Sequence, residues 1–260
     1  MNQTLSIIAN RRSTRTYCDQ PVTAQEKDLI LQAVFRAPTA GNMMLYSIIE
    51  VEDQALKDQL AHTCDNQPFI AKAPYVLLFL ADYQRWYDYY LQSGVVKRCQ
   101  ELDRTVRKPQ QGDLILACCD ALIAAQTAVL AAESLGIGSC YIGDILENYE
   151  IHRKIFALPP YTFPVTMLCF GRPAFVGNLP TEPTPRFERE FIVSKNSYHR
   201  QDAAQLEKMF QPLKKRYFAP GRFSAGAENI GQHYYFKKFI SDFSVEMSRS
   251  VRKMLKTWSR

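Results

Sequence analysis

The sequence lacks every spacing with which cysteine and histidine usually build a metal site or a disulfide framework. Its seven cysteines are scattered and odd in number, none stands in a C-x-x-C pair, and the four histidines form no close pair with them. This usage argues against a zinc module and a secreted disulfide scaffold. Residues 1–15 also contain no apolar stretch followed by a small-residue cleavage site. We therefore expect a reduced, cytoplasmic chain without a metal site.

Several catalytic motifs are absent as well. There is no Walker loop, no G-x-S-x-G elbow and no H-E-x-x-H. The glycines of 136–143 follow a helical pattern and have the wrong third spacing for a Rossmann fingerprint. Each histidine stands alone and is expected to be a satisfied surface or core group: His62, His152, His199 and His233. We nominate no catalytic acid or base, and expect that any enzyme activity uses a bound cofactor.

One apolar run, Leu114 to Ala132, approaches the length of a membrane span. It contains Asp120, Gln126 and Thr127, and no other segment resembles a second span. A charge in the middle of a bilayer costs about 2.5–3.5 kcal/mol. We interpret the run as a helix buried on all sides, in a core or a subunit interface, and expect no membrane partner.

The net charge of +6 is unevenly distributed, since residues 195–260 carry 14 Lys or Arg against 5 Asp or Glu. Three interpretations are open: a solvated tail, attraction of an anionic dinucleotide, or binding of nucleic acid through Tyr234, Tyr235 and Phe236. Apolar residues recur at helical spacing through 236–258, which commits those aromatics to packing and argues against nucleic acid. Arg222, in a glycine-containing loop, is a candidate contact for the 2′-phosphate of NADPH.

Periodicity predicts a mixture of helices and short strands. The Thr23–Glu26 pattern is a capping box, and a helix follows it. Predicted strands cover 46–51, 75–81, 139–142 and 165–170, and predicted helices cover 3–10, 54–62, 83–92, 113–135, 147–157, 201–217 and 233–257. A proline-rich connector spans 173–186. We divide the chain into a cofactor-binding domain, 1–192, and a C-terminal helical extension, 193–260.

The strongest positive signal is the segment R-R-S-T-R at 11–15. The guanidiniums of Arg11, Arg12 and Arg15 and the hydroxyls of Ser13 and Thr14 can surround a phosphate monoester, because arginine presents a planar fork of donors. The alternative is an exposed basic helix end, and the pentapeptide alone favours it.

Other motifs accompany that segment in a fixed order. R-R-S-T-R-x-Y at 11–17 is followed by A-P-T-A-G-N at 37–42, Gln67, E-S-L-G-I-G-S-C-Y-I-G at 133–143, F-G-R-P at 170–173 and P-T-P-R at 183–186. Together they resemble the nitroreductase superfamily of FMN flavoproteins, and within it the oxygen-insensitive major nitroreductases and NADPH:flavin oxidoreductases. The resemblance implies an α+β fold with a central, mostly antiparallel sheet, in an intertwined homodimer in which the long central helix packs against its twin. FMN would lie at the subunit interface.

The resemblance also implies a set of FMN-binding residues. Arg11 and Arg15 would bind the phosphate with Ser13 and Arg12 beside them, and Arg186 would reach it from the connector. Thr39, Gly41, Asn42 and Gln67 would lie near the flavin ring, and backbone amides of Ile142, Gly143 and Asp144 would face its N5 and O4. The chain departs from the usual pattern at three positions: Arg11 replaces a frequent histidine, Thr184 a frequent lysine, and Asp144 a common glycine.

By the same resemblance, the chain is expected to take hydride from NADPH, or from NADH, and to reduce nitro compounds, quinones or flavins. The alternatives are another FMN enzyme on this fold, such as an azo-, enone- or dehalogenating reductase, and a basic nucleic-acid-binding protein. For Asp144 two roles are open. Its side chain caps a helix that begins near Leu146, or its carboxylate opposes the negative charge of a reduced flavin.

Overall fold

The computed structural model describes residues 2–174, 184–217, 223 and 226–259. The chain forms two compact units, one of Met1–Gly177 with Glu246–Arg260 and one of Asn178–Val245. We call them the core unit and the second unit and describe each by itself. The predicted division into 1–192 and 193–260, which concerned cofactor binding, stays a prediction.

The core unit is built around one antiparallel sheet of four strands in the order β1-β2-β4-β3. The strands are β1 (Tyr46–Glu50), β2 (Tyr75–Asp82), β3 (Gly138–Ile142) and β4 (Thr162–Gly171). Every residue of β2 is buried, as expected of a central strand whose sequence is continuously apolar. The predicted α+β class with an antiparallel central sheet is confirmed.

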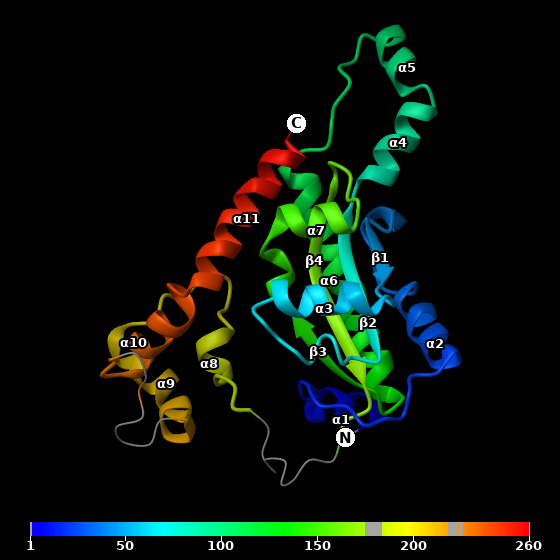
Figure 1. Ribbon diagram of the computed structural model, residues 1–260. Coiled ribbons are helices and arrows are strands. Elements are labelled where there is room, and N and C mark those ends of the chain that lie inside the picture. Colours follow the sequence, from blue (N-terminus) through cyan, green and yellow to red (C-terminus); the bar gives the residue numbers. More distant parts are fainter. Residues whose placement is uncertain (1, 175–183, 218–222, 224–225, 260) are drawn as a thin grey trace. The chain divides into compact units, whose positions relative to one another are not determined.

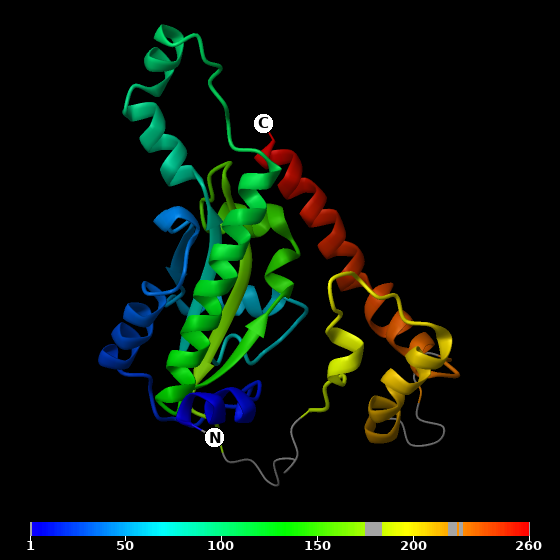
Figure 2. The ribbon, with the colours of Figure 1, turned by 180° about the vertical axis from the view of Figure 1, so that it is seen from behind.

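Helices cover both faces of this sheet. The long helix α6 (Gln111–Ser134) crosses one face, whereas α3 (Gln54–Thr63) and α7 (Tyr149–Ile155) lie on the other (Figures 1 and 2). The side of α6 that meets the sheet is rich in alanine, with Ala117, Ala121 and Ala124 fully buried. Small side chains let the helix axis approach the larger strand residues Leu77 and Phe79, with which Ala121 and Ala124 share one core cluster.

The opposite side of α6 carries large apolar side chains that the single chain leaves exposed. Ile115 is 63% exposed and Leu122 47% exposed. The expected burial on all sides is therefore not reached within one chain, and only the alternative, a subunit interface, stays open as a prediction. By length and composition α6 could cross a membrane, a criterion that core helices also meet, and 44% of its apolar window is buried.

The remaining elements of the core unit are short. They are α1 (Gln3–Asn10), α2 (Ala24–Val34), η1 (Ala40–Asn42), α4 (Gln84–Gln92), α5 (Val95–Glu101) and η2 (Asp144–Leu146). The capping box of Thr23 and Glu26 forms as predicted, with each side chain bonded to the other residue's backbone amide. Helix α5 and the two 3₁₀ turns were not predicted, since each is too short for a periodic pattern.

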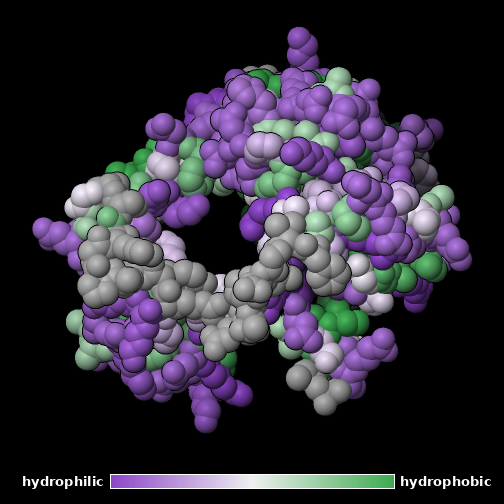
Figure 3. All heavy atoms as spheres, turned by 60° about the horizontal axis from the view of Figure 1, so that its bottom comes forward, coloured by the Kyte–Doolittle hydropathy of each residue, from purple (hydrophilic) through white to green (hydrophobic). Residues whose placement is uncertain are grey.

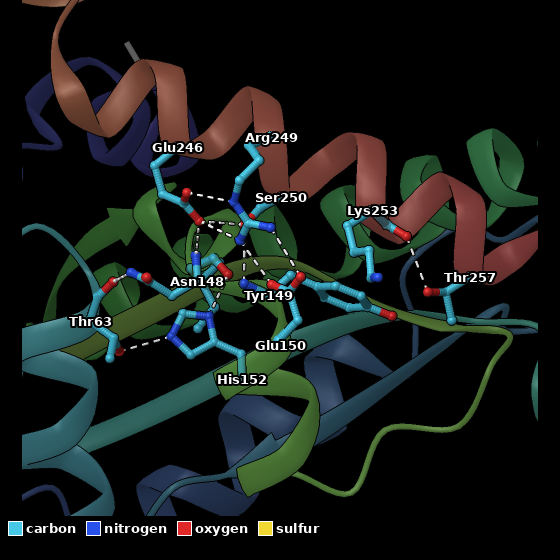
Figure 4. Close-up of polar contacts among 11 residues, drawn as sticks. Thr63, Asn148, Tyr149, Glu150, His152, Glu246, Arg249, Ser250, Lys253 and Thr257 are labelled. Atoms are coloured by element: carbon cyan, nitrogen blue, oxygen red, sulfur yellow. Dashed lines mark hydrogen bonds and ion pairs between the residues drawn. The ribbon is translucent and has the colours of Figure 1, made fainter.

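The end of the last helix, α11 (Asp242–Trp258), is fixed to the core unit by polar contacts around α7 (Figure 4). Arg249 donates to both carboxylate oxygens of Glu150 at 3.0 and 2.8 Å. Glu246 and the Ser250 hydroxyl accept the amides of Asn148 and Tyr149, at the start of α7. Trp258 is buried and donates to the Gln110 carbonyl, so residues 246–258 belong to the core.

The second unit is helical. It contains α8 (Arg189–Ile192), α9 (Ala203–Tyr217), α10 (Ile230–Tyr234) and a π-helical turn at Tyr235–Phe239. The single helix predicted over 233–257 is wrong, because the chain bends at Ile240–Ser241 between this turn and α11.

The aromatics around the start of the predicted stripe pack only in part within the second unit, where Tyr235 and Phe239 stack with ring centroids 5.5 Å apart. Tyr235 is 49% exposed and Phe239 72% exposed. On the face shown in Figure 3, hydrophobic residues form small groups separated by hydrophilic ones. Arg222, the candidate for the 2′-phosphate, and Pro180 and Pro183 of the connector lie outside the described residues.

Candidate flavin site

The segment 11–18 lies against the outer end of the sheet, where β3 begins and β4 ends. Ser13 forms a parallel bridge with Ser139, and the amide of Thr14 donates to the Ser139 carbonyl at 2.9 Å. Tyr17 forms an antiparallel bridge with Pro173. A Cβ on Gly138 would lie 2.1 Å from the Thr14 hydroxyl oxygen, so only glycine lets the segment approach this closely.

Three of the predicted phosphate ligands converge at this edge. Arg11 follows the last turn of α1 and donates to the Ser139 carbonyl at 3.4 Å, while its Nε is buried without a hydrogen-bond partner. Burial raises the pKa of the Cys140 thiol, and the opposing influences come from Arg15, Ser13 and Arg11, which all face it. Two guanidiniums and a hydroxyl therefore surround one point on β3. Such a set favours an anionic ligand.

The other two basic candidates lie differently. Arg12 is exposed on the same segment. Arg186 belongs to the second unit, where its Nη1 donates to the carbonyls of Thr184 and Pro185 at 3.2 and 3.3 Å. Its role at the phosphate stays a prediction.

A second group of predicted residues is held by one buried carboxylate of α6. Asp120, 2% exposed, accepts the amides of Ala40 at 3.0 Å and Leu45 at 3.1 Å, and also the Thr39 hydroxyl. The turn between them presents Gly41 and Asn42 with left-handed φ values of 56° and 57°. Thr39, Gly41 and Asn42 were predicted to lie near the flavin ring, but no sequence pattern connected them to Asp120.

This turn does not lie beside the segment 11–15 within one chain. It adjoins the end of β2, where the amide of Asp82 donates to the Leu45 carbonyl. Asp82 pairs with Thr162 of β4, whereas Ser139, beside the segment 11–15, pairs with Phe170. Eight residues along a strand correspond to about 26 Å. The single chain therefore keeps the 39–42 turn apart from the segment 11–15.

The third group lies at the far end of β3. Ile142 is the last residue of the strand and its side chain is buried, Gly143 is exposed, and Asp144 begins the 3₁₀ turn η2. The Gln67 Nε2 donates to the Asp144 carboxylate at 2.7 Å and to the Cys64 carbonyl at 2.9 Å. The proposed helix cap is wrong: the Asp144 side chain caps neither η2 nor α7, and its carboxylate accepts from Gln67 instead.

Sequence reasoning missed one residue of this group. Glu147 is 5% exposed, and its Oε1 has no hydrogen-bond partner. Burial, followed by the neighbouring charges of Asp144 and Asp65, raises the pKa of Glu147 to about 8. The sequence offered one indication of this position: Glu147 follows Asp144 by three residues, and residues three apart lie on the same side of a helical turn.

The histidine nearest this group is satisfied, as expected. His152 is fully buried, with its ring nitrogens 2.8 Å from the Thr63 hydroxyl and 3.0 Å from the Ile145 carbonyl, and burial lowers its pKa. Among the described residues, no group of His, Cys, Asp and Glu is arranged to hold a metal ion.

Strand β3 sets the distance between the arginine cluster at its start and the group of Gln67 and Asp144 at its end. Three residues separate Cys140, beside the arginines, from Gly143, which corresponds to about 10 Å. Cationic donors thus occupy one end of the strand, and an exposed backbone turn with one oriented side-chain amide occupies the other. A ligand with a charged end and a neutral hydrogen-bonding ring matches this arrangement.

A sequence profile of the nitroreductase family matches residues 8–172, which is more than half of the chain. The chain belongs to the nitroreductase family. It is 31% identical to an FMN reductase (NADPH) of Bacillus subtilis over 76% of each chain, and 30% identical to an oxygen-insensitive NADPH nitroreductase of Salmonella typhimurium over 85% of each. The crystal structure of nitroreductase A from Vibrio parahaemolyticus is 28% identical, with a TM-score of 0.73 over 84% of this chain and 86% of that one.

The contact between Gly138 and Thr14 yields a stability test. In Gly138→Ala the added carbon would meet the Thr14 side chain, including its Cβ at 2.8 Å, so the 11–15 segment must shift. We expect a loss of about 1–3 kcal/mol in the free energy of unfolding, measured by urea denaturation. The matched control is Gly112→Ala in the first turn of α6, where a new Cβ meets nothing within 4 Å. Equal stability of the two variants would contradict the placement of the segment.

Proposed function

We propose that this nitroreductase-family chain is an FMN-dependent oxidoreductase that uses NADPH or NADH to reduce nitroaromatics, quinones or flavins. The observation that carries the proposal is the pairing of the Arg11, Ser13 and Arg15 cluster with the Gln67 and Asp144 group along one strand. The names of relatives, FMN reductase (NADPH) and oxygen-insensitive NADPH nitroreductase, support the cofactor, the donor and the acceptor class.

The described residues fit FMN. The buried Nε of Arg11 lacks an acceptor, which a phosphate oxygen would supply. Arg15 carries a second guanidinium, and its cation lies 5.8 Å above the Phe69 ring, which limits its freedom. At the other end of β3, the Gln67 amide and the Gly143 and Asp144 backbone match the neutral, hydrogen-bonding ring.

When bound, FMN supplies the redox chemistry by accepting hydride from the nicotinamide and passing electrons to the acceptor. The chain's own part is binding, orientation and electrostatics. Amides of Ile142, Gly143 and Asp144 would donate toward the ring edge, where negative charge builds during reduction. No side chain is assigned as a catalytic acid or base. All seven cysteines are free thiols, which is consistent with the cytoplasmic location that we propose.

The direct test is an absorption spectrum of the purified protein, followed by NADPH addition without oxygen. We expect the flavin bands near a 1:1 ratio of FMN to chain, and their bleaching by NADPH. Nitroaromatic substrate should then restore them. A colourless protein that takes up no FMN would contradict the proposal, and bound FMN with poor nitro turnover would indicate another reductase on the same fold.

The phosphate assignment is tested by Arg15→Ala. One charge-assisted hydrogen bond contributes roughly 1.5–3 kcal/mol, so the variant should bind FMN about ten- to a hundredfold more weakly. Riboflavin, which has no phosphate, should lose little affinity. Arg98→Ala, on the exposed surface of α5, serves as the charge control. Equal losses for FMN and riboflavin in Arg15→Ala would refute the assignment.

We further propose a homodimer formed through the outer face of α6. That face exposes Ile115, Leu116, Leu122 and Ile123, an apolar surface that a stable monomer rarely leaves open. A partner's 39–42 turn would also complete a site from which this chain's own turn is separated.

A charge placed on the α6 face should dissociate the dimer. Leu122→Glu is expected to shift the protein from dimer to monomer at low micromolar concentration and to weaken FMN binding, as judged by light scattering and FMN titration. Leu29→Glu on α2, at a leucine of similar exposure, is the control and should stay dimeric. A wild-type protein that is monomeric under these conditions would rule the dimer out.

A further inference from the structure

The amide nitrogen and the amide oxygen of the Gln67 side chain differ in their hydrogen bonds. Its Nε2 donates to the Asp144 carboxylate and to the Cys64 carbonyl, so both amide hydrogens are used within the protein. Within the described part of the chain, no hydrogen bond to its Oε1 forms. Because a carboxylate only accepts hydrogen bonds, Asp144 also decides which amide atom faces it. The Oε1 oxygen is therefore left for a ligand.

Asp144 is in turn backed by a second acid. Glu147 is 5% exposed, and after burial the neighbouring Asp144 carboxylate is the largest influence that raises its pKa. Its Oε1 is buried and unpartnered. Two ionised carboxylates in contact away from water would repel strongly, whereas a protonated Glu147 can donate to an ionised Asp144. Protonation of Glu147 therefore removes the repulsion beside the carboxylate that accepts from Gln67.

We propose that Asp144, backed by Glu147, is a positioning residue that locks the Gln67 amide with its oxygen toward the cofactor, so that Gln67 accepts a hydrogen bond from the imide N–H of the flavin ring. The inference rests on the proposed function, because it needs FMN beside Gln67. The proposal goes beyond a contact between Gln67 and the ring, because it specifies that Gln67 is the acceptor of the hydrogen bond. It also gives a role to two acids, Asp144 and Glu147.

The groups around Glu147 determine its pKa, and so the pH range over which Asp144 fixes the Gln67 amide. Asp144 faces Glu147 from η2, Asp65 from the loop after α3, and Glu246 from α11, and each raises its pKa. Cys64, at the end of α3, has its pKa raised by burial and then by Asp144 and Glu147, so it stays neutral. The pKa of Glu147 near 8 means that its proton is lost as pH rises from 7 to 9. Asp144 should therefore fix the orientation of the Gln67 amide less firmly over that pH range.

An exchange of the acid and the amide tests the direction of the hydrogen bond. Gln67→Glu removes the donor to Asp144 and adds a third carboxylate, so the Kd for FMN should rise about tenfold or more. Adding Asp144→Asn supplies an amide donor to the carboxylate introduced at position 67, which still offers an oxygen to the ring. The double variant should bind FMN at least about fivefold more tightly than Gln67→Glu. Asp144→Asn alone can turn either its oxygen or its nitrogen toward Gln67, so the Gln67 amide is no longer fixed and FMN affinity should fall below that of wild type.

The outcomes separate the two proposals. If Gln67 instead donates to a ring carbonyl, the exchange offers no donor and the double variant stays as weak as Gln67→Glu, which would overturn the inference while wild-type FMN binding persists. A wild-type protein that does not bind FMN would overturn the proposed function and the inference together. Melting temperatures of all variants identify any that are unfolded.

A second measurement does not depend on the exchange. Glu147→Gln keeps the size and the hydrogen-bond donor but cannot ionise. Wild-type affinity for FMN should fall between pH 7 and 9, whereas the affinity of Glu147→Gln should stay nearly constant. A purely structural role for Glu147 would give the two proteins parallel profiles, and parallel profiles would overturn the inference.

Discussion

The position of the 39–45 turn depends on one buried charge, the Asp120 carboxylate in the middle of an otherwise apolar helix. An ion removed from water costs several kcal/mol unless hydrogen bonds replace its hydration. Asp120 recovers that cost from the Thr39 hydroxyl and the amides of Ala40 and Leu45. These bonds hold the turn in a conformation that includes a left-handed Asn42, which a free loop would rarely adopt. The helix, the turn and the start of β1 are therefore fixed together.

The edge strand β3 provides the second constraint. An edge strand presents unpaired backbone groups, and here the segment 11–14 uses some of them, so the arginines are fixed by backbone pairing and do not depend on side-chain packing alone. Gly138 permits that approach, and the turn at Gly143 follows directly after the strand. The backbone of β3 thus sets the spacing between the charged and the neutral end of the candidate site. Many side chains beside the strand can be replaced without changing that spacing.

Local patterns predicted what local forces determine. The four strands, the capping box of Thr23 and the long helix of 111–134 each depend on residues close in sequence, and each is found near its predicted place. The resemblance supplied the grouping of 11–15 with 142–144. Long-range contacts could not be read from the sequence. The Asp120 anchor spans about 80 positions, and the charges that raise the pKa of Glu147 include the distant Asp65 and Glu246. The break at Ile240 also has no marker, since apolar spacing continues through it.

Asp144 shows how one side chain constrains its surroundings. With glycine at position 144, the Gln67 amide would keep only the Cys64 carbonyl as a partner. The amide could then rotate more freely. An aspartate removes this freedom, but it introduces a charge beside the buried Glu147, and two charges in contact would be unfavourable. Protonation of Glu147 resolves the conflict and converts repulsion into a hydrogen bond. The protonation of Glu147 is thus coupled to the charge beside it, and a change at position 144 should alter the pKa of Glu147 before it alters the fold.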